Sequence, residues 1–275
     1  QKHSPLAFSE LTHSVCRGLL VGVACLAVAI PPPGHPARSG APAGMFARAG
    51  TAPAQPGPAA RFAAFGAAMA SADARHVADW VADSGDNEGA DFVIVDKRYA
   101  RVYVFDAAAR LKGATPVLLG AAAGDESVAG IGSRPIADVR PEERTTPAGR
   151  FIGERGRNAL GEDVVWVDYD AAVSMHRVRA TDPSERRLER LATPTSDDNR
   201  ISYGCINVPV AFYETHIRPT FASRRAVVYV LPESRPVQQV FGSYDVAGRH
   251  GRAAAIQQSA DVAAPLRARP RTPRS

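Results

Sequence analysis

Sulfur and aromatic side chains are scarce in this sequence. Only three of its 275 residues are cysteines, and 7% are aromatic. Cys16 and Cys25 lie in an apolar stretch near the N-terminus, so Cys205 is the single cysteine of the 250 residues that follow. Without that stretch, Cys205 has no partner for an intramolecular disulfide. Two interpretations stay open: a buried structural side chain, or a free and reactive thiol.

Several motifs that carry common enzyme chemistry are absent. The sequence has no HExxH, no CxxC and no cluster of Cys and His at zinc-binding spacing, so we predict no metal and no cofactor. It also lacks a G-x-S-x-G elbow and a Walker loop. The stretch GIGSRP, residues 130–135, does not have the glycine spacing of a phosphate-binding loop.

The positive charge is confined to one end of the chain. Residues 249–275 contain six arginines and one acid, which accounts for the whole net charge of +5. A nucleic-acid-binding fold would carry such charge on a structured face, so no nucleic acid partner is predicted. We predict that the basic segment 233–275 is a disordered tail, which leaves room for transient contact with a membrane or cell wall.

The N-terminus has the pattern of an export signal. Residues 18–30, GLLVGVACLAVAI, form an apolar run that is shorter than a membrane span of about 20 residues. This length and the Ala27-Val28-Ala29 triplet are typical of a signal peptide. We therefore expect a periplasmic or cell-envelope protein with a signal-like segment at 1–30, and an uncleaved anchor is the alternative. Residues 31–58, rich in Pro, Ala and Gly, are predicted to be a linker.

The rest of the chain is predicted to fold as a mainly β domain, a sandwich or barrel, with a few peripheral helices. Residues 59–90 form a helical N-terminal segment, because Phe62, Phe65 and Met69 have helical spacing and Ser71 suits the N-cap of a second helix. The main domain spans 91–232 and contains a polar loop, 124–148, that suits the rim of a substrate-binding site. Its expected strands are 92–96, 101–106, 115–123, 150–153, 164–169, 172–178 and 226–232, and its expected helices are 184–192 and 208–217.

The surroundings of Cys205 suit a nucleophile. A cysteine attacks as the thiolate, so its site must stabilise negative charge. Pro209 in a first helical turn, with Asn207 as cap, would place Cys205 just before a helix N-terminus. Gly204 permits a bend, and the backbone amides of Gly204 and Cys205 could then form an oxyanion hole.

A base for the thiol must come from few histidines. Outside the tails and linker the chain has only His76, His176 and His216. His76 lies on a helix far from the thiol in sequence, and His216 would be about 16 Å along a straight helix from Cys205. His176 remains the candidate base, although a strand histidine is equally often a core residue.

Three motifs together resemble the YkuD-type L,D-transpeptidase catalytic domain. They are TTPAGRF at 145–151, SMHRV at 174–178 and SYGCIN at 202–207. The resemblance covers about half of the chain and implies a β-sandwich-like fold whose cleft holds the cysteine. It also implies an exported enzyme that acts on peptidoglycan stem peptides through a Cys205 thioester, with His176 as the base. Ser202, Gly204 and Asn207 would shape the turn and the acyl site.

The sequence departs from this family at two places. Tyr203 stands where the family usually has a second histidine, and we predict that it orients the substrate or the oxyanion. A charged insertion lengthens the interval between His176 and Cys205, and Arg200 beside the motif could meet a substrate carboxylate. Two alternatives stay open: an L,D-carboxypeptidase or hydrolase of the same fold, and a catalytically silent wall-binding module.

Overall fold

The computed structural model describes residues 59–222 and 225–263. The signal-like segment, the linker and the last residues of the tail lie outside this range. No helix within it has both the length and the hydropathy that a membrane crossing requires.

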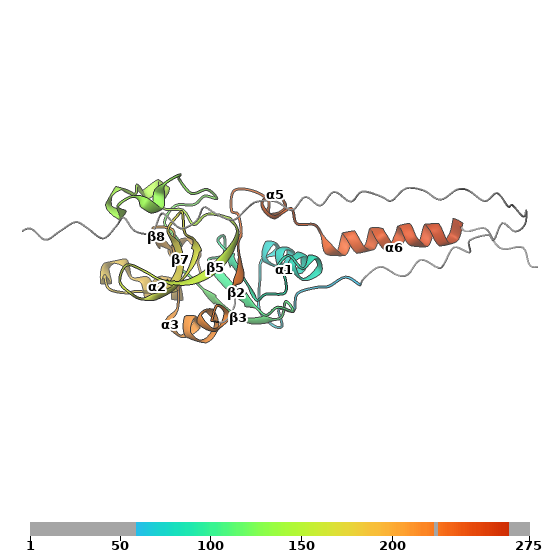
Figure 1. Ribbon diagram of the computed structural model, residues 1–275, viewed down its shortest axis with the longest axis horizontal. Helices are drawn as coiled ribbons and strands as arrows, with labels where there is room; N and C mark the ends of the chain where they lie inside the picture. Colours follow the sequence, from blue (N-terminus) through green and yellow to red (C-terminus); the bar gives the residue numbers. More distant parts are fainter. Residues whose placement is uncertain (1–58, 223–224, 264–275) are drawn as a thin grey trace, which may run out of the picture. The chain divides into compact units, whose positions relative to one another are not determined.

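One eight-stranded sheet forms the body of the protein (Figure 1). Its strands, in spatial order, are β3 (Leu111–Pro116), β2 (Arg101–Phe105), β1 (Phe92–Asp96), β10 (Ala226–Val230), β5 (Gly149–Arg157), β6 (Asp163–Asp168), β7 (Val173–Arg177) and β9 (Ile206–Val208). A backbone bridge between Leu118 and Asn207 links the last strand back to the segment after β3, so the sheet nearly closes. Two short strands, β4 (Leu119–Gly120) and β8 (Arg200–Ser202), pair beside it. The prediction of a mainly β, barrel-like fold is confirmed.

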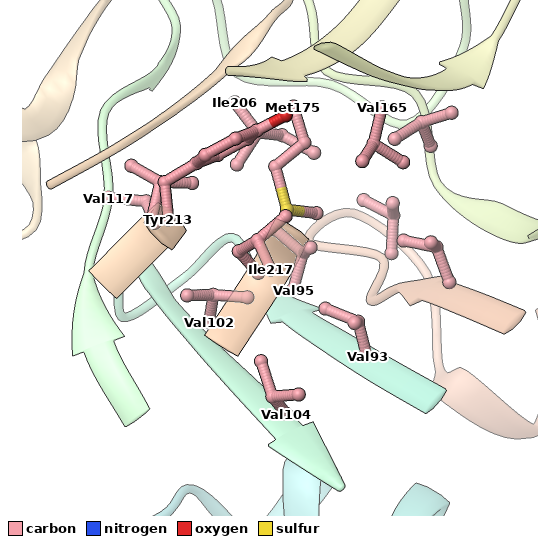
Figure 2. Close-up of a cluster of buried hydrophobic side chains, with 14 of the residues drawn as sticks. Val93, Val95, Val102, Val104, Val117, Val165, Met175, Ile206, Tyr213 and Ile217 are labelled. Carbon is pink, nitrogen blue, oxygen red and sulfur yellow. The ribbon is translucent and has the colours of Figure 1, made fainter. Parts of the chain in front are cut away.

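The inner face of this sheet encloses the larger hydrophobic core. Alternate residues of each strand point inward, and Val93, Val95, Val102 and Val104 from the first hairpin are fully buried there. Figure 2 shows the side chain of Met175, from β7, in the middle of this cluster. The core thus fixes the position of β7, the strand that carries His176.

A second core lies on the outer face of β1, β2 and β10. The helix α1 (Ala72–Ser84) covers that face with Val77, Val81 and other apolar side chains, and the Ser71 hydroxyl caps it by accepting from the Ala74 amide. These strands are therefore apolar on both faces, which explains why FVIVD and RVYVF contain almost no polar residue. The predicted helix from Ser71 is confirmed.

The structure corrects three local predictions. Residues 62–69 are not helical: Ala64 pairs with Arg110 as an isolated bridge, and Phe65 is buried in the second core. The strand expected at 115–123 is divided between β3 and β4. The tail from 233 contains two helices, α5 (Val237–Phe241) and α6 (Val246–Ala263), where disorder was expected.

Helix α6 and the segment just before it are attached to α1 by polar side chains. Nε2 of His250 lies 2.9 Å from Oδ1 of Asp83 on α1, and the Tyr244 hydroxyl donates to the other oxygen of this carboxylate at 2.8 Å. Composition cannot show such a long-range attachment, which is why the disorder prediction fails there.

Two connecting segments border the site. The loop 124–148, green in Figure 1, contains the 3-10 turns η1 (Ile131–Ser133), η2 (Ile136–Asp138) and η3 (Pro141–Glu143). Its Gly132 packs against the backbone of the turn between β6 and β7. The charged insertion forms η4 (Pro183–Glu185), the short helix α2 (Arg187–Ala192) and η5 (Asp197–Asn199), and the Asp182 side chain accepts from the Ser184 amide. The helix expected over 184–192 is interrupted, because Arg186 has a left-handed backbone with a φ of 50°.

Candidate active site

The candidate site is built on a parallel pair of strands. In the register of β7 and β9, Met175 lies opposite Ile206 and His176 opposite Asn207. Cys205 precedes β9 directly, so this register brings it beside Ser174. The Ser174 amide donates to the Cys205 sulfur at 3.5 Å, and the Ser174 hydroxyl lies 3.6 Å from the same atom. The thiol predicted to be reactive is therefore next to the strand that carries the predicted base.

The backbone fixes the tautomer of His176. Its Nδ1 lies 2.8 Å from the carbonyl oxygen of Arg177, and a carbonyl can only accept, so Nδ1 carries the proton. In the neutral ring Nε2 is then a proton acceptor, as a general base requires. Ser174 and His176 stand two residues apart on one strand and share a face, which is the face of the thiol.

The ionisation of the two groups is coupled. Burial alone would raise the pKa of the Cys205 thiol, but the interaction with the His176 imidazole and the Ser174 contacts outweigh it and lower that pKa. Burial alone would lower the pKa of His176, but the interaction with the thiolate raises it. Both shifts favour a thiolate–imidazolium pair, which is the reactive form of a catalytic cysteine.

The turn before Cys205 is held by its own side chains. The Ser202 hydroxyl donates to the carbonyl of Cys205 at 2.6 Å and accepts from the Gly204 amide at 3.1 Å. The Asn207 amide group donates to the same Cys205 carbonyl at 3.2 Å. Ser202 and Asn207, which we predicted to shape the turn, therefore lie where they can do so.

One prediction about this turn is wrong, and the structure changes one part of a second. Asn207 lies in β9 and caps no helix, because the helix α3 (Val210–Phe212) begins only after Pro209. The helix start that we expected directly after Cys205 is therefore replaced by strand β9. The Gly204 amide already donates to Ser202, so it is not a free oxyanion donor. The amides of Tyr203 and Cys205 donate to no acceptor within residues 59–222 and 225–263, so they are the available donors.

Gly204 is required by the backbone. Its φ of +128° is one that side chains rarely adopt, and a Cβ there would lie 2.7 Å from the carbonyl oxygen of Thr145. The Thr146 hydroxyl donates to the Gly204 carbonyl at 2.8 Å. The TTPAGRF motif thus lies directly against the SYGCIN turn, although 58 residues separate Thr146 from Gly204.

Substitution of Gly204 by alanine should damage both stability and reactivity. The added methyl group would strain the backbone by about 1–3 kcal/mol and would push the turn away from Thr145. A displacement of about 1 Å at the thiol can cost roughly 10²-fold in rate. We expect Gly204→Ala to lower the melting temperature and to slow acylation of Cys205 by that factor.

The control for this variant is Gly89→Ala. Gly89 also has a positive φ of 71°, but a Cβ there would meet no atom within 4 Å. The control should therefore lose a little stability and keep its thiol reactivity. Equal acylation rates in the two variants would contradict the steric explanation.

The structure does not place the remaining candidates, Arg200, His76 and His216, at the thiol. Arg200 pairs with Glu233 and donates to the Lys97 carbonyl, and it is not among the residues that line the cleft at Cys205. We therefore assign Arg200 to the fold and not to the substrate. His76 lies within hydrogen-bonding distance of Ser243, and His216 packs against Gly113 of β3.

A cleft of about 360 Å³ opens at the thiol. It is lined by Ile136, His176, Arg179, Thr181, Glu185, Arg187, Ser202, Tyr203, Cys205 and Asn207. The ring of Tyr203 is 43% exposed and lies 4.1 Å from the guanidinium of Arg144. The loop 124–148 supplies Ile136, so its prediction as a substrate rim agrees with its location.

Sequence reasoning missed two contributors to the site. Ser174 contacts the sulfur, and its position two residues before His176 on a strand was a signal that could have found it. Arg187 comes from the charged insertion, pairs with Glu185 and donates to Asn207 at 2.6 Å. No local pattern marks Arg187, because its contact with Asn207 depends on how the insertion folds back. No group of three or more potential metal ligands occurs among the described residues.

The fold and site thus define a mainly β domain in which a thiol and an imidazole line one open cleft. No family model and no curated protein matches the sequence. The solved structures that match are mostly L,D-transpeptidases, the family that the sequence motifs resemble.

Three of these structures illustrate the likeness. An L,D-transpeptidase of Enterococcus faecium is 14% identical, with 52% of this chain and 50% of that chain covered and a TM-score of 0.28. The L,D-transpeptidase of Mycobacterium smegmatis is 13% identical, with 51% of this chain and 58% of that chain covered and a TM-score of 0.30. The helical cell shape determining protein Pgp2 of Campylobacter jejuni is 12% identical, with 66% of this chain and 75% of that chain covered and a TM-score of 0.35. The chain spans about half the length of the E. faecium protein.

Proposed function

We propose that this protein is a cysteine acyltransferase of the L,D-transpeptidase type that acts on peptidoglycan stem peptides. The observation that carries the proposal is that Cys205 and His176 line one open cleft, where the imidazole lowers the pKa of the thiol. The resemblance of the three motifs supplies the substrate class. The signal-like segment supports the further proposal that the protein acts outside the cytoplasm.

The first half-reaction forms a thioester. The Cys205 thiolate attacks the carbonyl carbon between the L-centre of a diamino acid and a D-residue. The amides of Tyr203 and Cys205 donate to the oxyanion that develops. The S–C bond forms, the C–N bond breaks, and the imidazolium of His176 gives its proton to the departing amine.

The second half-reaction releases the acyl group. An incoming amine gives its proton to Nε2 of His176 and attacks the thioester carbon. The C–S bond breaks and the electron pair returns to sulfur, so the thiolate and imidazolium are restored. Water in place of the amine would give the carboxypeptidase or hydrolase alternative with the same residues.

A labelling experiment tests the thiol. The rate of alkylation of Cys205 should increase with pH, and the midpoint of this increase should lie below about 8.5, the ordinary thiol pKa. The reason is that the imidazolium partner stabilises the thiolate. A carbapenem should add one acyl group to the peptide that contains Cys205 and none to that peptide in Cys205→Ala. Cys16 and Cys25 are replaced by serine in all samples, so that they cannot take the label.

Product analysis tests the substrate. With purified muropeptides, the protein should release a terminal D-residue and form a new amide or a shortened peptide. A thiol that titrates at or above about 8.5 and takes no acyl group would reject the enzyme and favour the silent wall-binding module. That module would keep its affinity for peptidoglycan in Cys205→Ala.

A further inference from the structure

A second cavity adjoins the cleft at His176. Its volume is about 480 Å³, and His176 and Arg179 line both spaces. The second cavity reaches the tip of the β5–β6 hairpin on one side and Arg218 of α4 (Arg218–Thr220) on the other. We call it the arginine cavity.

The arginine cavity carries a surplus of positive charge. Its lining contains five arginines (155, 157, 177, 179 and 218) and two acids, Glu162 and Asp163. Some of these charges are neutralised within the protein, since Arg177 pairs with Asp163 and Arg179 with Glu162. Glu214, just outside the lining, pairs with both Arg177 and Arg218, so two positive charges remain in excess. No step of the proposed reaction uses them.

Arg155 and Arg218 are the two arginines of the arginine cavity that also line a further, smaller hollow. The Arg155 side chain makes no ion pair or hydrogen bond with any described residue, and Arg218 pairs only with Glu214 within that same part of the chain. Both side chains are exposed. Arg155 also lines two further hollows along β5, of about 580 and 370 Å³. Arginine side chains therefore line these neighbouring hollows as well as the arginine cavity.

We infer that the arginine cavity binds carboxylate groups of the peptide whose amine accepts the acyl group. The inference rests on the proposed function. The cleft at Cys205 is filled by the acyl group at this stage, and the attacking amine must still reach His176 to lose its proton. The arginine cavity shares His176 as a wall, so the rest of the acceptor peptide can lie there. Guanidinium groups bind carboxylates through paired hydrogen bonds, so Arg155 and Arg218 suit the free carboxylates of a stem peptide.

The experiment measures how the thioester divides between two acceptors. The acyl-enzyme forms from one donor peptide and is offered a stem peptide with free carboxylates or the same peptide with every carboxylate amidated. The variants are Arg155→Gln, Arg218→Gln and the double variant. Arg110→Gln is the control, because Arg110 is also an exposed arginine and lines none of these cavities.

The wild type should favour the carboxylate acceptor over the amidated one by about tenfold, the factor expected for one charge-assisted contact. The double variant should lose this preference and shift the thioester from transfer toward hydrolysis by about the same factor. The KM for the carboxylate acceptor should rise while kcat changes little, and added salt should weaken the preference in the wild type only. The control should behave as the wild type does.

Other outcomes overturn the inference, and they differ from failure of the proposed function. Absence of any thioester in the wild type rejects the enzyme itself. A thioester that forms but reacts equally well with both acceptors, or only with water, rejects the role of the arginine cavity. Binding of polyphosphate by Cys205→Ala more tightly than the carboxylate peptide, with loss of that binding in the arginine variants, would reject it in favour of a phosphate-bearing polymer.

Discussion

Replacing His176 by glutamine should lower the rate at which Cys205 is acylated by about 10³-fold, within the range usual for the loss of a general base. Glutamine keeps a polar side chain but accepts no proton. Without the imidazolium, burial is the dominant influence on the thiol, so its pKa should rise above the ordinary value instead of lying below it. The measurement is the rate of acyl-enzyme formation by mass spectrometry as a function of pH.

His76→Gln is the matched control for this variant. His76 is on α1, within hydrogen-bonding distance of Ser243, and does not line the cleft. The control should acylate at the wild-type rate with an unchanged pH profile. If His176→Gln retained the wild-type rate and profile, the thiol would owe its reactivity to another group, and the two-residue mechanism would be untenable.

The pairing of Cys205 with His176 was predictable only in part. The motifs marked both residues, but nothing local in the sequence specifies that β7 and β9 run side by side in parallel with His176 opposite Asn207. Parallel pairing is a long-range property that depends on the closure of the whole sheet. The helix expected over 208–217 is present from Val210 to Ile217, but Val208 belongs to the buried strand β9. A short apolar run suits a strand as well as the start of a helix, so the sequence does not fix this boundary.

The pairing of the first hairpin, in contrast, was predictable from the local sequence. Phe92–Asp96 and Arg101–Phe105 pair residue by residue as predicted, because β-branched and aromatic residues flank a short polar turn. Local chemistry suffices when partners are close in sequence. Local patterns mislead at residues 62–69. Their apolar spacing suits a helix, but Ala64 pairs with Arg110, 46 residues away.

A buried ion pair connects the hairpin turn to the active-site turn. The Lys97 side chain is fully buried, and its ammonium group donates to Asp125 and to the Thr146 carbonyl, both at 2.9 Å. Burial lowers the pKa of Lys97, and the two carboxylates beside it oppose that shift. Burial alone would raise the pKa of Asp125, but hydrogen bonds from Ser234 and Lys97 lower it well below its usual range. Asp125 therefore stabilises the fold above its unfolded pKa of about 3.9, and this contribution is lost as the pH falls below it.

Substitution of Lys97 by methionine should lower the free energy of unfolding by about 3–5 kcal/mol, the usual loss when one partner of a buried pair is removed. Methionine fills similar space, so the loss arises from the carboxylate that is left without its cation. Denaturant unfolding at pH 7 is the measurement. Lys112→Met is the control, because the Lys112–Asp91 pair is about one-third exposed and should contribute less than about 1 kcal/mol.

Lys97→Met should also slow the acylation of Cys205, although Lys97 does not line the cleft at the thiol. Lys97 holds the carbonyl of Thr146, and the hydroxyl of Thr146 holds the carbonyl of Gly204, the residue before the thiol. Lys97→Met should therefore reduce acylation of Cys205 even at temperatures where the variant is folded, while Lys112→Met should not. In the double variant Lys97→Met/Asp125→Asn the unpaired charge is gone, so the stability loss should be smaller than the sum of the two single losses. Additive losses, or a Lys97→Met variant as stable as the Lys112→Met control, would show that the buried pair does not hold these two turns together.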